Sequence, residues 1–239
     1  MSSPSSSLHS SASIYNRYAL HFYDLVVLVF SNTFAWRCPT KSVLLPFFVQ
    51  HLQGVHTHLD IGVGSGYYPA HSTTHFIKNG TKLTLMDMNL STLHVSLARI
   101  RAAGLKGKVE LIAHDVFIPA PEGIRNAPFE AVSLFYLLHC LPGKISDKTS
   151  RICTQLIPLM QPDGTLYGAT ILGKGVQHNW IGRLLMRLWN SKGVFDNYED
   201  DLEGLAAALK EHFEEVKVVV EGKVALFVAK RPLKHSVSL

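Results

Sequence analysis

A glycine-rich segment follows an acidic residue in the first third of the chain, where residues 60–66 read DIGVGSG. Glycines at such a place let the backbone turn tightly and lie in van der Waals contact with a ligand. An ordinary turn between a strand and a helix has the same composition, so the loop alone is weak evidence. As a dinucleotide-binding fingerprint it fails, because Tyr67 stands where the third glycine belongs. The loop is therefore a candidate cofactor site whose ligand other residues must decide.

Three carboxylates stand at the ends of successive expected strands. Asp87 lies about 20 residues after the glycine loop, where an acidic side chain can accept hydrogen bonds from both hydroxyls of a ribose. Asp60 and Asp115 end their own strands in the same way. For any one of them, capping the following turn is the simpler interpretation. The three together favour a ligand crevice, because the carboxyl ends of strands in an open α/β sheet form one.

Apolar runs that alternate with helical patterns predict the elements that position these groups. Strands are expected at 56–61, 82–86, 109–113, 129–135 and 164–172, with helices between them. Connections of that length predict parallel strands with helices on both faces of the sheet. The runs 216–220 and 224–229 are three residues apart, which predicts an antiparallel hairpin. The expected fold class is α/β: a Rossmann-like, doubly wound, seven-stranded sheet, mostly parallel with a C-terminal antiparallel hairpin.

The order of these motifs resembles a known family. The run HLDIGVGSG at 58–66, with Asp87, Asp115, FEAV at 129–132 and the late hairpin, is similar to the class I S-adenosylmethionine-dependent methyltransferases. The resemblance covers roughly residues 55–230. The run YLLHCLP at 136–142 is similar to the small-molecule branch, which includes enzymes of the ubiquinone-biosynthesis type.

The resemblance implies S-adenosylmethionine as the cofactor and gives each motif a part of it. The three glycines of the loop would line the methionine moiety, and Asp60 would orient its ammonium group. Asp87 would hold the ribose, Asp115 and the backbone of Val116 would read the adenine, and Phe135 and Tyr136 would lie near the sulfonium. The implied cofactor-binding residues are Asp60, Gly62, Gly64, Gly66, Asp87, Met88, Asp115, Val116 and Phe135.

The chain lacks motifs of two other branches of the family, and this limits the classes of substrate that we expect. The chain lacks the Asn-Pro-Pro-Tyr sequence of the branch that methylates adenine or glutamine nitrogen. It also lacks the aspartate that metal-dependent, catechol-type enzymes use at the end of the fourth strand. Neither a nucleic-acid substrate nor a metal is therefore expected. His71 and His75 are four residues apart but have no third ligand, and three scattered cysteines form no zinc pattern.

His139 and Tyr136 are the candidate catalytic residues. A histidine with a pKa near neutrality can take the proton of a hydroxyl as the methyl group arrives. His139 follows the fourth strand by a few residues, at the crevice edge, and Tyr136 is the other polar group there. A histidine that only packs or accepts a hydrogen bond is an equally good interpretation of His139.

Segments outside the core motifs predict a covered acceptor site. We expect a disordered, serine-rich tail at 1–13, a helical cap at 14–54, a core at 55–232 with a lid insertion at 173–201, and a short tail at 233–239. Methyl transfer needs alignment and exclusion of water. The apolar composition of cap and lid favours a small apolar or aromatic acceptor, although ordinary core helices would have the same composition.

Composition excludes some partners. The net charge of +5 is scattered rather than gathered in a stripe, which disfavours nucleic acid, and no apolar run is long enough to span a membrane. We expect a cytoplasmic protein whose oligomeric state the sequence leaves open. Two rival functions stay open as well: a protein of the same fold that binds the cofactor but catalyses a non-methylating reaction such as cyclisation, and a nucleic-acid-binding module, which a salt-dependent affinity would reveal.

Overall fold

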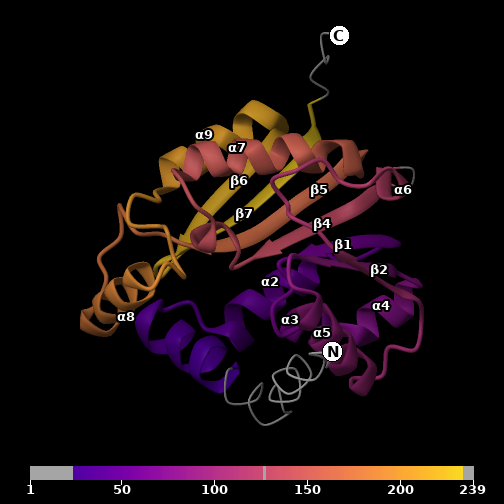
Figure 1. Ribbon diagram of the computed structural model, residues 1–239, viewed down its shortest axis with the longest axis horizontal. Coiled ribbons are helices and arrows are strands. Elements are labelled where there is room, and N and C mark those ends of the chain that lie inside the picture. The colour runs from indigo at the N-terminus through magenta and orange to yellow at the C-terminus, as the bar shows by residue number, and fades with distance from the viewer. Residues whose placement is uncertain (1–23, 126–127, 234–239) are drawn as a thin grey trace, which may run out of the picture.

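The computed structural model describes residues 24–125 and 128–233. Its centre is a seven-stranded sheet of order β3-β2-β1-β4-β5-β7-β6 (Figure 1). The strands are β1 Thr57–Ile61, β2 Lys82–Asp87, β3 Val109–Ala113, β4 Phe129–Phe135, β5 Met160–Ile171, β6 Phe213–Glu221 and β7 Val224–Pro232. The first five run parallel, and β7 pairs antiparallel with both β5 and β6. The predicted fold class is confirmed.

Helices cover both faces of the sheet, with α7 and α9 on one side and α2 to α5 on the other (Figure 1). The α-helices are α2 Leu45–Gln50, α3 Tyr67–His71, α4 Thr73–Asn79, α5 Leu90–Ala102, α6 Glu122–Arg125, α7 Ile145–Leu156, α8 Trp180–Ser191 and α9 Leu202–His212. Two short 3₁₀ turns, η4 Leu138–Cys140 and η5 Ile157–Leu159, flank α7. One core cluster joins Phe48 and Leu93 to the sheet, and a second joins Ile152 and Leu209 to its opposite face.

The topology switches direction between β1 and β4. After β1 the chain adds β2 and then β3 on one side, and it returns to place β4 and β5 on the other. Loops that leave β1 and β4 therefore diverge, and this opens a crevice at the carboxyl ends of the two strands. Asp60 of β1 lies opposite Ser133 of β4 in this register.

The turn between β6 and β7 packs against residues 36–37 of the cap. Gly222 has φ of +63°, and a Cβ atom there would overlap the carbonyl oxygens of Trp36 and Arg37. The backbone N–H of Lys223 donates a hydrogen bond to Trp36 O at 2.7 Å. The glycine therefore permits both the turn and the close approach of the cap.

The run Pro162-Asp163-Gly164 predicts a turn before the strand expected at 164–172, and this prediction is wrong. Residues 160–171 form one strand, and the register moves from Phe129↔Met160 to Ala131↔Thr165. The extra residues form an irregularity of the β-bulge kind inside β5. Proline, aspartate and glycine are typical of both features, so the sequence alone did not distinguish them.

The cap contains two π-helical segments, η2 Asp24–Ala35 and η3 Thr40–Leu44, the second continuing into α2. Pro39 in the run Trp36-Arg37-Cys38-Pro39 predicts a helix break. Residues 36–39 are indeed non-helical and link η2 to η3, and Arg37 adopts φ of +52° there. The expected tail at 1–13, the cap residues before 24 and nearly all of the expected C-terminal tail lie outside the described residues. Among the described helices, none is long and apolar enough to cross a membrane.

Candidate active site

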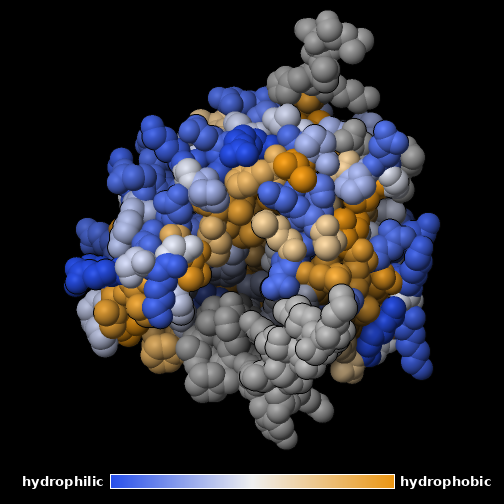
Figure 2. Space-filling model, viewed as in Figure 1, coloured by the Kyte–Doolittle hydropathy of each residue, from blue (hydrophilic) through white to orange (hydrophobic). Residues whose placement is uncertain are grey.

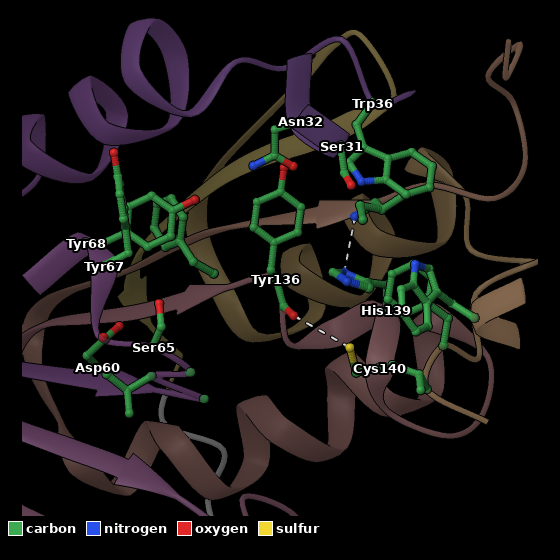
Figure 3. Close-up of a pocket in the computed structure, with 18 residues that line it drawn as sticks. Ser31, Asn32, Trp36, Asp60, Ser65, Tyr67, Tyr68, Tyr136, His139 and Cys140 are labelled. Atoms are coloured by element: carbon green, nitrogen blue, oxygen red, sulfur yellow. Dashed lines mark hydrogen bonds between the residues drawn. The ribbon is translucent and has the colours of Figure 1, made fainter. Parts of the chain in front are cut away.

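A cavity of about 240 Å³ lies at the carboxyl ends of β1, β4 and β5 (Figure 3). Strand ends, loops, α3 and η4 of the core contribute Asp60, Gly62, Val63, Gly64, Ser65, Tyr67, Tyr68, Phe135, Tyr136, His139, Cys140 and Ile171. The cap contributes Ser31, Asn32 and Trp36, and the 173–201 insertion contributes Trp189, Val194 and Phe195. One cavity thus joins the glycine loop to both segments that the sequence analysis set apart from the core.

The three glycines of the loop all adopt positive φ, but they serve different purposes. A Cβ at Gly66 would lie 2.9 Å from Ser96 of α5, and one at Gly62 would lie 3.0 Å from the Leu137 side chain. At Gly64, with φ of +54°, the nearest atom to a Cβ would be Gly62 O at 3.9 Å. Gly66 is therefore required for helix packing, whereas Gly64 lines the cavity.

Asp60 is the buried carboxylate of the cavity, with 4% of its surface exposed. The hydroxyl of Ser133 donates a hydrogen bond to it, and His58 Nε2 lies 2.9 Å from the same hydroxyl. Desolvation raises the pKa of Asp60 to about 7, the Ser133 hydrogen bond opposes this shift, and the charge of Asp87 adds to it. A cationic ligand group would relieve the unfavourable burial of this charge.

Asp87 ends β2 and does not line the cavity. Its Oδ1 accepts a hydrogen bond from Asn89 N at 2.9 Å, and the backbone of Gly64 also donates to the carboxylate. Desolvation raises its pKa, and these two hydrogen bonds partly offset the shift. Met88 beside it is 70% exposed. Asp87 thus supports the glycine loop and has an apolar, accessible neighbour.

Asp115 and Val116 lie farther along the same edge, beyond β3 and outside the cavity lining. Asp115 Oδ1 accepts a hydrogen bond from Phe117 N at 2.9 Å, while Val116 is buried. The backbone N–H of His114 donates to Asp87 O at 3.0 Å, which joins the loops after β2 and β3. The three predicted carboxylates are therefore arranged in order along β1, β2 and β3, and only Asp60 reaches the cavity.

Tyr136 is a strained residue at the centre of the cavity. It adopts φ of +57°, uncommon for a non-glycine residue, and its backbone N–H donates to Ala169 O at 2.8 Å. Its buried hydroxyl has no hydrogen-bond partner among the described residues, and it points toward Asn32 of the cap (Figure 3). Such strain at a cavity is typical of functional positions.

His139 lines the cavity but is only 3% exposed. Its Nδ1 accepts a long hydrogen bond of 3.4 Å from Ile171 N, and its ring lies edge-on to the ring of Phe195, with centroids 4.5 Å apart. Burial, helped by the charge of Lys148, lowers the pKa of His139 to about 3. The prediction of a pKa near neutrality for His139 is therefore wrong, because burial of the ring disfavours the charged imidazolium.

Asn32 and Trp36 are cavity residues that sequence reasoning did not identify. Asn32 is 2% exposed and donates from Nδ2 to Thr40 Oγ1 at 2.8 Å, which bridges η2 and η3. Trp36 lies in the non-helical link at 36–39 between η2 and η3. Their sole signal was the aromatic composition of the cap. Within the described residues, no three His, Cys, Asp or Glu side chains gather as they would around a metal ion.

Comparison with known proteins decides the family. No protein-family model matches the chain. It is 41% identical over 233 residues to methyltransferase verB of Penicillium polonicum, covering 94% of this chain and 100% of that one. It is 43% identical over 221 residues to the physcion biosynthesis cluster O-methyltransferase of Aspergillus chevalieri, covering 92% of this chain and 94% of that one. The chain belongs to the class I S-adenosylmethionine-dependent methyltransferases.

Solved structures share the fold of this methyltransferase. An O-methyltransferase family protein from Burkholderia thailandensis superposes with a TM-score of 0.65 at 14% identity, over 93% of this chain and 62% of that one. The N-methyltransferase NodS of Bradyrhizobium japonicum, solved with S-adenosyl-L-homocysteine, gives 0.54 at 15% identity over 79% and 89%. The methyltransferase therefore spans about three fifths of the first structure. The family predicted from the motif order is confirmed, while the ubiquinone-type branch stays a prediction.

Proposed function

We propose that this enzyme transfers the methyl group of S-adenosylmethionine to a hydroxyl oxygen of a small, apolar or aromatic metabolite. The observation that carries the proposal is the two-ended cavity (Figure 3). One end presents a buried carboxylate, Asp60, and an open glycine backbone, Gly64. The other end is walled by three aromatic side chains, Trp36, Trp189 and Phe195.

The residues at the first end fit the cofactor. Asp60 can receive the ammonium group of the methionine moiety, since it is a buried carboxylate in need of a cation. Gly64 leaves the room that a side chain would fill. We assign the ribose to Asp87 with Met88, and the adenine to Asp115 and Val116, which follow along the same sheet edge. When bound, S-adenosylmethionine supplies an activated methyl group that needs no further driving force from the protein.

The second end favours a planar aromatic acceptor. Trp36 and Trp189 each lie about 6 Å from Phe195, centroid to centroid, so the three rings form one wall. The polar groups near this wall are the Tyr136 hydroxyl and the Asn32 amide, which can fix an acceptor oxygen by hydrogen bonds. The O-methyltransferase named above as a relative supports oxygen as the acceptor atom. Exclusion of water by this wall would strengthen the alignment of the reacting groups.

We assign the proton of the acceptor hydroxyl to His139, with Tyr136 as the group that orients the hydroxyl. A pKa of about 3 means that the imidazole is neutral at working pH. Its lone pair is on Nδ1, so His139 can take a proton only by giving up the long hydrogen bond from Ile171 N, and it is a weak base. His139 therefore contributes modestly, and most of the rate enhancement comes from alignment. A small-molecule substrate and a cytoplasmic location remain predictions of the same account.

The test is methyl transfer to defined phenols. Purified enzyme is incubated with S-adenosylmethionine and 2-naphthol, and with cyclohexanol as the non-aromatic control, and S-adenosylhomocysteine is quantified by mass spectrometry. We expect product with 2-naphthol and none with cyclohexanol. Equal turnover of both would overturn the aromatic acceptor. Tight cofactor binding with no transfer to a broad panel of phenols, amines and thiols would favour a non-methylating reaction on this fold.

A further inference from the structure

A charged side chain lies wholly inside the protein behind the aromatic wall. Lys148 of α7 is 1% exposed, and its Nζ contacts three oxygens: Leu141 O at 3.1 Å, Asp196 O at 2.8 Å and the Asp200 carboxylate at 2.8 Å. Asp200 is also 1% exposed. Burying an ion pair is unfavourable unless each charge is fully satisfied, so it adds little stability over apolar side chains of similar size. A role in geometry explains its presence better.

The oxygens around Lys148 belong to two segments that build the cavity. Leu141 lies in the loop after β4, which carries His139, and Asp196 and Asp200 lie at the end of the 173–201 insertion. The two segments are also bonded directly, since Asp196 N donates to His139 O at 2.9 Å and Gly143 N donates to Asp196 Oδ2 at 2.8 Å. Lys148 therefore holds the end of the insertion against the loop.

The held segment carries the central ring of the wall. Phe195 immediately precedes Asp196, lines the cavity and contacts His139. Lys148 itself does not line the cavity. Any shift of Asp196 would move Phe195 and the backbone of His139 together, because both are bonded to the same short segment.

We propose that Lys148 and Asp200 are a positioning pair that fixes the acceptor wall of this enzyme without touching the acceptor. A second attachment keeps the insertion in place when the pair is lost: Asn197 Nδ2 donates to Ile171 O at 3.0 Å. Loss of the pair should therefore loosen the wall rather than detach the insertion. The statement about the acceptor rests on the proposed function, whereas the statement about the wall does not.

Four variants separate positioning from stability. Lys148→Met removes the cation, Lys148→Arg keeps it, and Lys148→Met combined with Asp200→Leu removes both charges. Lys174→Met is the matched control, because Lys174 pairs at 3.4 Å with Glu199 in the same insertion, and both side chains are mostly exposed. Each variant is also made in a Trp180→Phe background, since Trp180 is 69% exposed and would mask the emission of the two wall tryptophans.

We expect Lys148→Met to raise KM for 2-naphthol at least tenfold and to change the Kd of S-adenosylhomocysteine, measured by calorimetry, less than twofold. Acrylamide should quench the wall tryptophans more strongly, Lys148→Arg should restore part of each loss, and Lys174→Met should match the wild type. The double variant should recover the thermal stability that Lys148→Met loses, but its KM should stay raised. A double variant with both wild-type Tm and wild-type KM would show that the pair is purely structural. An equal rise of KM and Kd in Lys148→Met would show the same. If 2-naphthol is no substrate, the quenching still decides the claim about the wall: unchanged quenching in Lys148→Met overturns it.

Discussion

The hydroxyl of Ser133 on β4 donates a hydrogen bond to the carboxylate of Asp60, its register partner on β1. His58 Nε2 lies 2.9 Å from the same hydroxyl, and the Tyr167 hydroxyl lies 3.5 Å from His58 Nε2. All four side chains are buried. The carboxylate that faces the cavity is therefore held from behind by a polar chain that crosses β1, β4 and β5.

Asp60→Asn should weaken binding of S-adenosylhomocysteine by about 10- to 100-fold, because it removes a charge-assisted hydrogen bond to the ammonium group. 5′-Methylthioadenosine, which has no amino-acid part, should bind to the variant as it does to the wild type. Calorimetry with both ligands makes the comparison. Equal losses for both would mean that Asp60 supports the site as a whole rather than the ammonium.

The same substitution should raise the stability of the ligand-free protein at alkaline pH. Burial raises the pKa of Asp60 to about 7 from an ordinary value of 3.8, so the folded state holds a proton that the unfolded state releases. Ionised Asp60 therefore lowers the free energy of unfolding. This unfavourable contribution grows as pH rises from 3.8 to 7 and is fully present above pH 7. Thermal melts at pH 8 should show a higher Tm for Asp60→Asn than for wild type, with the difference absent near pH 4. A lower Tm at pH 8 would contradict the raised pKa.

Asp87→Ala should weaken the binding of S-adenosylhomocysteine and of 5′-methylthioadenosine alike, by about 1.5 to 3 kcal/mol, because both ligands carry the ribose. Asp87 also accepts backbone hydrogen bonds from Asn89 and Gly64, so Asp87→Asn, which keeps one oxygen acceptor, serves as the control for loop structure. An unchanged Kd in Asp87→Ala would leave Asp87 as a turn cap only.

Gly64→Ala should lose cofactor affinity at least tenfold, since the new methyl group would occupy part of the cavity that Gly64 lines. Its φ of +54° also costs about 1 kcal/mol for an L side chain. Gly80→Ala is the matched control, with φ of +63° and no atom within 4 Å of a Cβ. Both variants should show a similar decrease in Tm, and only Gly64→Ala should bind the cofactor more weakly. Equal binding by the two would exclude the loop as the cofactor cradle.

His139→Ala should lower kcat with 2-naphthol and leave the Kd of S-adenosylhomocysteine unchanged. Because burial lowers its pKa to about 3, the imidazole stays neutral across the usual assay range, and we expect no His139-dependent rise of turnover near neutrality. The loss should lie near the lower end of the roughly 10²- to 10⁴-fold range of general bases, because a weak base transfers protons less effectively. A rise near neutral pH that disappears in the variant would show a much higher pKa in the working enzyme.

The sequence predicted what local patterns determine. Asp60, Asp87 and Asp115 were recognised as strand ends because apolar runs stop there, and the hairpin was recognised from the short link at Glu221–Lys223. The pairing of Asp60 with Ser133 was not predictable, since it depends on which strands become neighbours. The lowered pKa of His139 was not predictable either. Phe195, whose ring packs against the imidazole, is distant in the chain, and the charge of Lys148 acts from α7.

The cavity should bind the cofactor, and titration of the purified enzyme with S-adenosylhomocysteine measures this binding. Calorimetry should show one site per chain with a Kd in the micromolar range for the wild type, and a loss confined to S-adenosylhomocysteine over 5′-methylthioadenosine in Asp60→Asn. No detectable binding of either ligand by the folded wild-type protein would contradict the account.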